Sequence, residues 1–415
     1  MPAPTPRPPG SSPGRQAADH LLEAVLERGR TLEEALDSTP AMEPRDKAVG
    51  HRIAAMVLRR LGSLDAAMEP WLRRRPPAPA LRALRIGAAE LLLLGTAPHA
   101  AVSAAVSLAP KPLAGVVNAV LRRLAEAGPA ALEGLDAERL DTPSWLWASW
   151  QAAHGDAVRL IAAAHREEAP LDLTLKPGAA APPGGEMRAT GSWRYPAGTR
   201  ITELPGFAEG DFWAQDEAAA LPARLLGARP GERVADLGAA PGGKTAQLAA
   251  TGAQVVAVER EARRMERLRA NMTRLGLRPE LVQADITAWR PDALFDAVLL
   301  DAPCTATGTI RRHPDVPHLK RAKDVVLQAA TQRNLLAAAA KLLKPGGRLV
   351  FATCSLQAEE GEAHLAHLPD GLALDPIRPD EAPGVTEQGP AGGTVRTRPD
   401  MGMDGFFIAR MLRSP

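Results

Sequence analysis

The stretch DLGAAPGGKT, residues 236–245, joins an apolar run to a helical run and decides how the chain around it is interpreted. Its last eight letters, Gly238 to Thr245, fit the phosphate-loop pattern G-x-x-x-x-G-K-[ST]. The apolar run VADLG leads into it and the letters TAQLAA follow, so we predict a strand, a glycine-rich turn and a helix. Such a turn is typical of phosphate loops, and also of doubly wound sheets in which a cofactor passes close to the backbone. The eight letters alone leave both possibilities open.

Acidic residues stand at the ends of the apolar runs that follow. Glu259 ends VVAVE, Asp285 ends ELVQAD and Asp301 ends AVLLD, while Asp236 and Gly238 stand at the end of the first run. The carboxyl ends of parallel strands form the ligand-binding edge of a doubly wound sheet. Acids gathered there repel a triphosphate and suit the ribose and the sulfonium of S-adenosyl-L-methionine (SAM). We therefore expect SAM as the cofactor, although AVLLD also fits a Mg²⁺-binding strand of a phosphate-loop NTPase.

The expected cofactor site combines the glycine-rich loop with these acids. Its residues are Gly238, Ala239, Ala240, Pro241, Gly242, Gly243, Lys244, Glu259, Asp285 and Asp301. We expect Lys244 to position the loop or a neighbouring acid; a surface lysine at the start of a helix is the simpler alternative.

Working outward from this stretch, the chain divides into segments of different periodicity. From residue 206 to residue 415, short apolar runs alternate with helical stretches, which predicts an α/β Rossmann-like domain with a parallel sheet between helices. Residues 15–128 carry apolar residues at helical spacing and predict an all-α bundle. Residues 129–205 predict a small α+β connector, and residues 1–14, rich in Pro, Gly and Ser, predict a disordered tail.

Composition limits the classes of protein to which the chain can belong. Of its 415 residues, 45% are hydrophobic and 24% are charged, as in globular proteins that bury real cores. The net charge of +2 is too small to indicate a nucleic-acid partner by itself. We expect no signal peptide and no membrane span, because no apolar run is long enough. The histidines and cysteines show no metal-ligand spacing, so we expect no metal.

The chain has two cysteines, Cys304 and Cys354, and each follows an apolar run. So few thiols indicate a reducing compartment, and we expect the protein in the cytoplasm. Two buried core thiols are one explanation. The other is catalysis: a thiolate that attacks carbon 6 of cytosine makes carbon 5 nucleophilic towards a methyl sulfonium. Asp301, three residues before Cys304, would support the charge that develops at ring N3.

Several motifs resemble those of the RsmB/NOP family of RNA cytosine-C5 methyltransferases. They are DLGAAPGGKT, DAPCTATGTIRRHPD, KLLKPGGRLVFATCSLQAEE and GMDGFFIAR, preceded by GDFWAQDEAA. The resemblance covers about residues 200–415 and implies that Cys354 is the nucleophile and that Cys304 assists product release. The family more often has cysteine at position 238 and aspartate at position 259, and neither departure removes a needed functional group.

The helical segments of residues 15–128 resemble a NusB-like RNA-binding domain. Such a domain, fused before this catalytic domain, implies that the substrate is 16S ribosomal RNA, modified at a cytosine of the 967 type. We expect a monomer. Three alternatives stay open at this point: a methyltransferase for transfer RNA or another ribosomal RNA site, a phosphate-loop NTPase, and a non-catalytic RNA-binding or assembly factor.

Two further groups of polar residues are candidates for contact with RNA. Arg311–His313 follow the first cysteine motif and are candidates for phosphate contacts. Asn118, Arg122 and Arg123 are candidates for the RNA face of the helical domain. In both groups a solvated loop or helix face explains the residues equally well.

Overall fold

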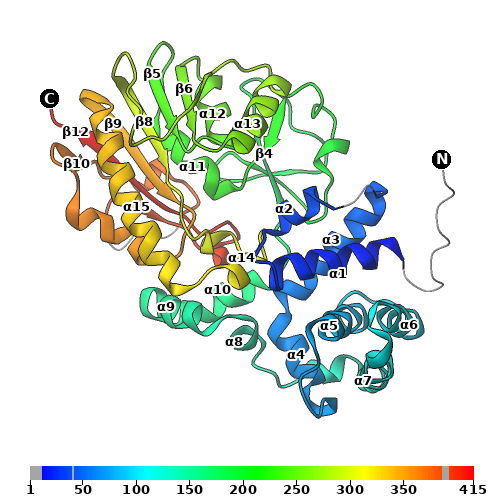
Figure 1. Ribbon diagram of the computed structural model, residues 1–415. Helices are drawn as coiled ribbons and strands as arrows, with labels where there is room; N and C mark the ends of the chain where they lie inside the picture. Colours follow the sequence, from blue (N-terminus) through cyan, green and yellow to red (C-terminus); the bar gives the residue numbers. More distant parts are fainter. Residues whose placement is uncertain (1–11, 40–41, 386–391) are drawn as a thin grey trace. The chain divides into compact units, whose positions relative to one another are not determined.

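The computed structural model describes residues 12–39, 42–385 and 392–415. The chain forms two compact units, shown in Figure 1. One comprises the chain up to Glu167 together with His313–Arg321, and the other comprises Glu168–Arg312 and Ala322–Pro415. Residues 1–11 of the expected tail lie outside the described residues. The first helix begins at Pro13, inside that expected tail, because proline suits the first turn of a helix.

The first unit contains helices and no strand among its described residues. These are α1 (Pro13–Leu26), α2 (Leu32–Asp37), α3 (Pro44–Arg59), α4 (Leu61–Met68), α5 (Ala78–Leu92), α6 (Pro98–Leu108), α7 (Ala114–Ala127), α8 (Ala137–Asp141), α9 (Ser144–His154), α10 (Ala157–His165) and α14 (Val316–Leu319), with 3-10 turns at Glu69–Trp71, Lys111–Leu113 and Gly128–Leu132. The expected 129–205 connector thus contributes its helices to this unit and its strands to the other.

Small residues let these helices pack closely. A Cβ atom at Gly50 of α3 would lie 2.5 Å from the Cβ of Ala17 in α1, so glycine is required at this crossing. Leu21, Leu22 and Leu58 fill the core around the crossing and are almost fully buried. Helical spacing of such residues is the signal that predicted the bundle.

Helix α14 joins this unit from a distant part of the sequence. Asp315 accepts a hydrogen bond from the backbone N–H of Leu32 at 3.0 Å, and His318 Nε2 bonds the carbonyl of Leu58 at 2.9 Å. Burial lowers the pKa of His318, so the imidazole stays neutral at physiological pH. Segment 313–321 therefore leaves the α/β unit and is held by the helical unit.

The second unit opens with a small antiparallel sheet of order β2-β3-β1-β4. Its strands are β1 (Leu171–Leu175), β2 (Glu186–Met187), β3 (Trp193–Tyr195) and β4 (Phe212–Ala214). The rest of the unit is a larger sheet of order β10-β12-β9-β8-β5-β6-β7, with β11 paired to β12. Strands β5, β6, β7, β8 and β9 run parallel, whereas β12 runs antiparallel to β9.

The elements of the larger sheet follow the predicted alternation of strand and helix. They are α11 (Glu217–Leu226), β5 (Arg233–Leu237), α12 (Gly243–Ala250), β6 (Gln254–Glu259), α13 (Ala262–Arg274), β7 (Glu280–Gln283), β8 (Phe295–Asp301), α15 (Ala322–Lys341), β9 (Leu343–Thr353), β10 (Leu372–Leu374), β11 (Val395–Arg396) and β12 (Phe407–Arg413). This confirms the prediction of an α/β Rossmann-like fold.

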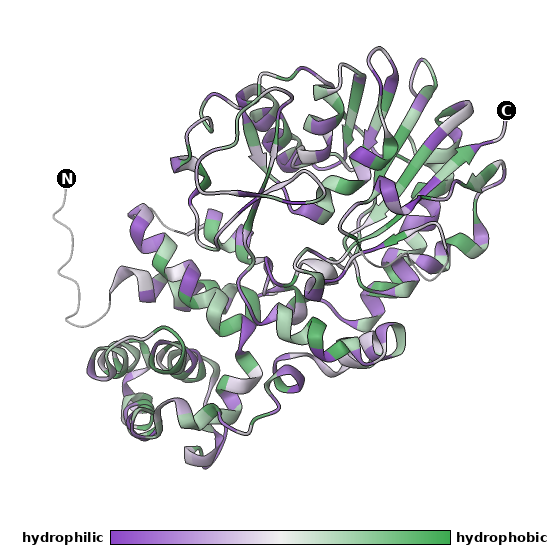
Figure 2. Ribbon diagram, turned by 180° about the vertical axis from the view of Figure 1, so that it is seen from behind, coloured by the Kyte–Doolittle hydropathy of each residue, from purple (hydrophilic) through white to green (hydrophobic). Residues whose placement is uncertain are grey.

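The two faces of the larger sheet bury alternate residues of each strand. Val234 and Leu299 pack with α11 and α12 on one face, whereas Ala235 and Leu300 pack with α15 on the other. Both faces are covered, so the strands carry long hydrophobic stretches, visible as green segments in Figure 2. The carboxyl ends of β5, β6, β8 and β9 consequently meet at one edge, and the loops that follow them build the candidate site.

Candidate active site

The glycine-rich loop is shaped by close backbone contacts. Gly238 has φ +80°, and a Cβ there would lie 2.5 Å from the carbonyl oxygen of Asp301. Gly242 has φ +111° and precedes the first residue of α12. The N–H groups of Gly238 and Ala239 both donate to the carbonyl of Val258, at 3.0 and 3.1 Å. These two donors are engaged in the fold and do not form a nest for a phosphate.

Lys244 forms an ion pair across the loop instead of pointing to solvent. Its Nζ lies 2.7 Å from Oδ2 of Asp301, and its side chain is only 12% exposed. Burial acts to lower the pKa of Lys244, but the charge of Asp301 and the hydrogen bond to it raise that pKa above its usual range. Nζ also lies 5.4 Å from the ring centre of Phe406. Lys244 is therefore charged and held over the edge of the sheet.

The three other acids that the sequence singled out near the loop have different surroundings. Glu259 is buried; its Oε1 accepts the N–H of Glu261, while its Oε2 has no hydrogen-bond partner among the described residues. Arg264 Nη1 lies 3.5 Å from that oxygen. Asp236 is fully buried, accepts from the hydroxyl of Thr245 at 2.5 Å, and has its pKa raised to about 7 by burial.

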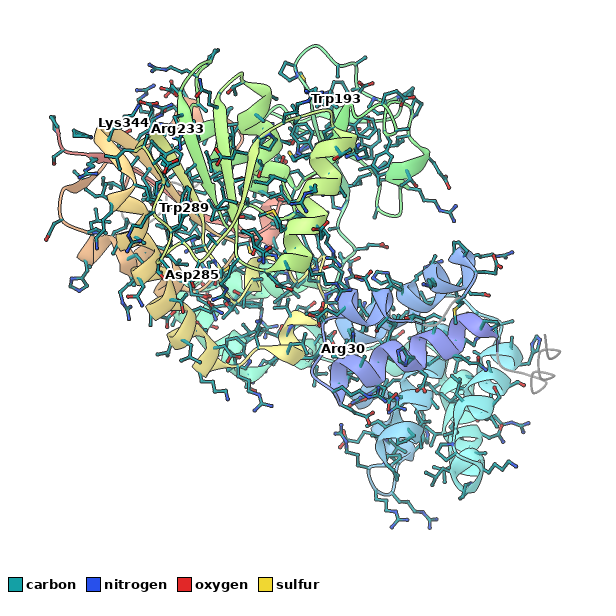
Figure 3. All side chains as sticks on the ribbon, turned by 45° about the horizontal axis from the view of Figure 1, so that its top comes forward. Arg30, Trp193, Arg233, Asp285, Trp289 and Lys344 are labelled. Carbon is teal, nitrogen blue, oxygen red and sulfur yellow. The ribbon has the colours of Figure 1, made fainter. Side chains whose placement is uncertain are left out.

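Asp285 lies beyond its strand and is exposed. Strand β7 ends at Gln283, and both the N–H and the hydroxyl of Thr287 donate to Asp285 Oδ1. These bonds hold the pKa of Asp285 below its usual range. In Figure 3, Asp285 lies apart from Arg233 and Lys344, which mark the opposite end of the sheet at the starts of β5 and β9. Asp285 thus faces solvent at the rim of the carboxyl edge.

A cavity of about 580 Å³ opens at this edge. The predicted site residues that line it are Gly238, Glu259, Asp285, Asp301, Cys304 and Cys354. The other predicted loop residues do not line it; they are Ala239, Ala240, Pro241, Gly242, Gly243 and Lys244. The edge of the sheet therefore brings together the two thiols, one end of the loop and three of the acids.

Polar residues of α15 also line the cavity, and the sequence interpretation missed them. They are Gln328, Thr331 and Asn334. Their spacing of three places them on one face of the helix. This row of polar residues in an otherwise Ala- and Leu-rich helix is the sequence feature that could have indicated a side of α15 facing the site. Arg264 of α13, which bonds the carbonyl of Ala240 at 2.7 Å, is a further lining residue that the sequence did not indicate.

The two thiols lie side by side although they are distant in sequence. Cys304 Sγ and Cys354 Sγ are 3.4 Å apart. The hydrogen bond to Cys354 raises the pKa of Cys304 well above its usual range, and burial and the charge of Cys354 act in the same direction. The Cys304 thiol is therefore hard to deprotonate. Both thiols are partly exposed and line one cavity, so they are not two buried core thiols.

The interpretation of Arg311 and Arg312 as phosphate contacts is wrong. Arg311 is buried and lies 2.6 Å from both Asp216 and Asp404. Arg312 pairs with the same two acids, at 2.5 and 3.0 Å. These pairs join the start of α11 to the loop before β12, so both guanidinium groups are used to hold the unit together. His313 belongs to the segment held by the helical unit.

Within the described ranges, no group of three His, Cys, Asp or Glu residues is placed to hold a metal ion. No helix in the same ranges is long and apolar enough to cross a membrane.

Comparisons with known proteins agree with this architecture. Residues 223–412 match the family described as "16S rRNA methyltransferase RsmB/F", and residues 12–126 match the NusB family. The ribosomal RNA small subunit methyltransferase B of Xanthomonas campestris pv. campestris is 36% identical over 432 residues, which is 96% of this chain and 97% of that protein. The protein of the same name from Sodalis glossinidius is 34% identical over 446 residues, 96% of this chain and 97% of its own length.

Two solved structures have a similar fold. The crystal structure of PH0851 covers 96% of this chain and 98% of its own, with a TM-score of 0.74 and 24% identity. A methyltransferase homolog protein from Pyrococcus horikoshii covers 64% of this chain and 93% of its own, with a TM-score of 0.53 and 26% identity. The likeness of the first extends over both units.

Proposed function

Since this chain belongs to the RsmB/F family and is a SAM-dependent ribosomal RNA methyltransferase, we propose that it forms 5-methylcytosine in 16S ribosomal RNA through a covalent adduct with Cys354. A cytosine of the 967 type is the proposed target. One observation carries the proposal: the two sulfur atoms lie 3.4 Å apart in the wall of a cavity that Asp301 also lines. A thiol pair is unnecessary for methylation of oxygen or nitrogen, whereas carbon 5 of cytosine needs activation by a nucleophile.

The residues around the cavity fit SAM. The Oε2 of buried Glu259 has Arg264 Nη1 at 3.5 Å but accepts no hydrogen bond within the described residues, so it suits a ribose hydroxyl as a donor. Gly238 lines the cavity and has no side chain, so a ligand can approach the backbone there. Asp285, at the rim, is available to a polar edge of the adenosine moiety. When bound, SAM supplies the electrophilic methyl group that carbon 5 of the activated base accepts.

Cys354 is the proposed nucleophile because the raised pKa of Cys304 disfavours the thiolate form of Cys304. The proton of the pair stays on Cys304, so the thiolate of Cys354 is free to form a bond to carbon 6 of the base. Asp301 is proposed to contact the base at N3, and the positive charge of Lys244, 2.7 Å from Asp301, offsets the negative charge that moves onto the ring. Rigid fixation of this carboxylate avoids reorganisation during the addition.

Cys304 is proposed to act after methylation. Once Cys354 is bonded to carbon 6, it carries no thiolate charge and no longer holds the proton on Cys304. The Cys304 thiol then loses its proton to water, and the resulting thiolate takes up the proton that leaves carbon 5. The bond between Cys354 and carbon 6 breaks at the same stage, which restores the aromatic ring and the Cys354 thiolate. The expected order is therefore addition by one thiol and release by the other.

The helical unit is proposed to contribute affinity for RNA. A groove of about 950 Å³ on this unit is lined by Arg73, Arg74, Arg75 and Arg123 beside apolar residues such as Trp71, and it includes no acidic residue. Arg73 and Arg74 are exposed and form no ion pair within the described parts of the chain. Arginines without partners beside an aromatic side chain suit phosphates and unstacked bases.

Substitution of each cysteine tests the proposed function. Cys354→Ala should abolish transfer of methyl groups from labelled SAM to 16S ribosomal RNA and should form no covalent complex. Cys304→Ala should transfer at most one methyl group per enzyme molecule and should accumulate an enzyme–RNA adduct that survives denaturing electrophoresis. Exchanged phenotypes would refute the assignment of roles, and full activity of Cys354→Ala would refute the covalent mechanism. Mapping of 5-methylcytosine in ribosomal RNA from cells without the gene tests the target nucleotide.

A further inference from the structure

A buried carboxylate lies between the loops that carry the two thiols. Glu360, in the 3-10 turn Ala358–Glu360, has no exposed surface. Its Oε1 accepts the backbone N–H of Thr305 at 2.9 Å, and its Oε2 accepts the hydroxyl of Ser355 at 2.5 Å and also the hydroxyl of Thr305. Thr305 directly follows Cys304 and Ser355 directly follows Cys354, so one side chain ties together the two residues next to the sulfur atoms.

Helix α15 supplies a further donor to the same carboxylate. Gln332 Nε2 lies 3.3 Å from Glu360 Oε1 and 2.9 Å from the carbonyl of Pro303, immediately before Cys304. The Oε1 of Gln332 in turn bonds the buried imidazole of His364 at 2.9 Å. Burial lowers the pKa of His364 to about 4, so this imidazole is neutral and fixes the orientation of the amide.

The surroundings of Glu360 suit a carboxylate. Four donors converge on its two oxygens. Burial raises the pKa of Glu360, while these hydrogen bonds act to lower it. No lysine or arginine pairs with Glu360 in the part of the chain that the structure describes, so its charge is balanced by hydrogen bonds alone. Such a buried charge is costly, and a packing role would be met at lower cost by an apolar residue.

We propose that Glu360 is a positioning residue for the thiol pair: it holds the Cys304 and Cys354 loops in register, and its negative charge keeps the shared proton on Cys304. This inference rests on the proposed function, in which Cys354 attacks as a thiolate while Cys304 waits as a thiol. Glu360 itself does not line the cavity, so it acts on the reaction only through the two cysteines.

The electrostatics of the pair support the second part of the proposal. The raised pKa of Cys304 has the hydrogen bond to Cys354 as its largest cause, followed by burial and the charge of Cys354, and the charge of Glu360 adds to them. Removal of the carboxylate charge should make Cys304 easier to ionise. A Cys304 that has lost its proton can no longer donate a hydrogen bond to the Cys354 sulfur.

The test uses the full-length enzyme and the variant Glu360→Gln, with Glu359→Gln as the matched control. Glu359 is the exposed neighbour, so the control removes the same charge one residue away. Alkylation of each cysteine by iodoacetamide is followed by mass spectrometry from pH 6 to pH 10, and methylation is measured with saturating SAM. SAM affinity, measured by calorimetry, reports that each variant is folded.

We expect Glu360→Gln to lower kcat by about 10- to 100-fold, as for a small misplacement of reacting groups, with KM for RNA changed by less than about twofold. The pH midpoint of Cys304 alkylation should move down by about half to one unit, which is about three- to tenfold faster alkylation at neutral pH. Faster alkylation at every pH with an unchanged midpoint would mean mere exposure of the thiol and would overturn the role of the charge.

A second variant keeps the test decisive if Glu360→Gln loses SAM binding. Ser355→Ala removes one of the four donors and leaves the carboxylate in place, and it should lower kcat by a smaller factor while preserving the midpoint of Cys304. The proposal would be overturned if every variant that still binds SAM had the same kcat as Glu359→Gln. Because alkylation requires no catalysis, it tests Glu360 even if the covalent mechanism fails with Cys354→Ala.

Discussion

The ion pair between Lys244 and Asp301 can be tested by a double-mutant cycle. The same experiment tests whether the glycine-rich loop binds a nucleoside triphosphate or SAM. The variants are Lys244→Met, Asp301→Asn and the combination of the two. Methionine keeps the length of the lysine side chain, and asparagine keeps the shape of the aspartate. If Lys244 is held by Asp301, each single variant leaves an unpaired group behind, and the double variant does not.

The structure sets the expected magnitude. Two unit charges at the 2.7 Å separation of Nζ and Oδ2 attract each other by about 6 kcal/mol at an effective dielectric constant of about 20. Much of this is offset by the cost of desolvation, and breaking a fully buried pair typically costs about 3–5 kcal/mol. Because 28% of the Asp301 side chain is exposed, solvent compensates part of the loss, and we expect about 2 kcal/mol for each single variant.

The assay is urea unfolding of the four proteins, followed by circular dichroism and tryptophan fluorescence at pH 7.5. The coupling energy should be about 1–2 kcal/mol, within the range found for side chains in contact. SAM affinity measured by calorimetry should fall in Asp301→Asn, because Asp301 lines the cavity, and less in Lys244→Met, because Lys244 does not. Additive effects with no coupling, together with ATP binding that depends on Lys244, would refute the reasoning and restore the phosphate-loop interpretation.

Two further predictions concern RNA affinity and pH. The double variant Arg73→Ala, Arg74→Ala should weaken binding of a 16S ribosomal RNA fragment. It should also reduce the slope of log affinity against log salt by about 1.4, since each single-strand phosphate contact contributes about 0.7. The control Arg45→Ala, Arg52→Ala removes the same charge and should keep the wild-type slope, so equal slopes for the two double variants would exclude the groove as an RNA-binding surface. Because burial raises the pKa of Asp236 to about 7, the folded state binds a proton that the unfolded chain releases near pH 4, so stability should fall as pH rises from about 4 to about 7. Asp236→Asn should remove up to about 1.4 kcal/mol of that loss per pH unit, and unfolding midpoints with the same pH dependence in both proteins would contradict this.

Much of the fold was predictable because its signals are local. The run VADLG became β5 and AVLLD became the end of β8, since strands buried on both faces must be apolar throughout. The helices before residue 128 were equally clear from their apolar spacing. Boundaries were less certain: the first helix begins inside the expected tail, and the expected 129–205 connector is divided between the two units at Glu167.

Part of the candidate site was predictable for a different reason. In a parallel sheet, residues that follow the strands lie at the same edge, which explains why Cys304 and Cys354 lie side by side although 50 residues separate them. The same rule placed Glu259 and Asp301 at the cavity. The interpretation of Arg311 was wrong. The charge of Arg311 suggested a partner outside the protein, but Arg311 pairs with Asp216 and Asp404. Sequence spacing does not reveal which acid will lie opposite a given arginine.

The sequence by itself determined the order of elements, the edge at which the ligand-binding residues gather, and the chemistry that two thiols beside an acid can perform. These properties follow from periodicity and from residue type, which are read along the chain. Only the tertiary structure decided that Lys244 is paired with Asp301, that the pKa of Cys304 is raised by its contact with Cys354, and that Glu360 joins the two cysteine loops. Protonation and ion pairing depend on burial and on neighbours distant in sequence, and these exist only after the chain has folded.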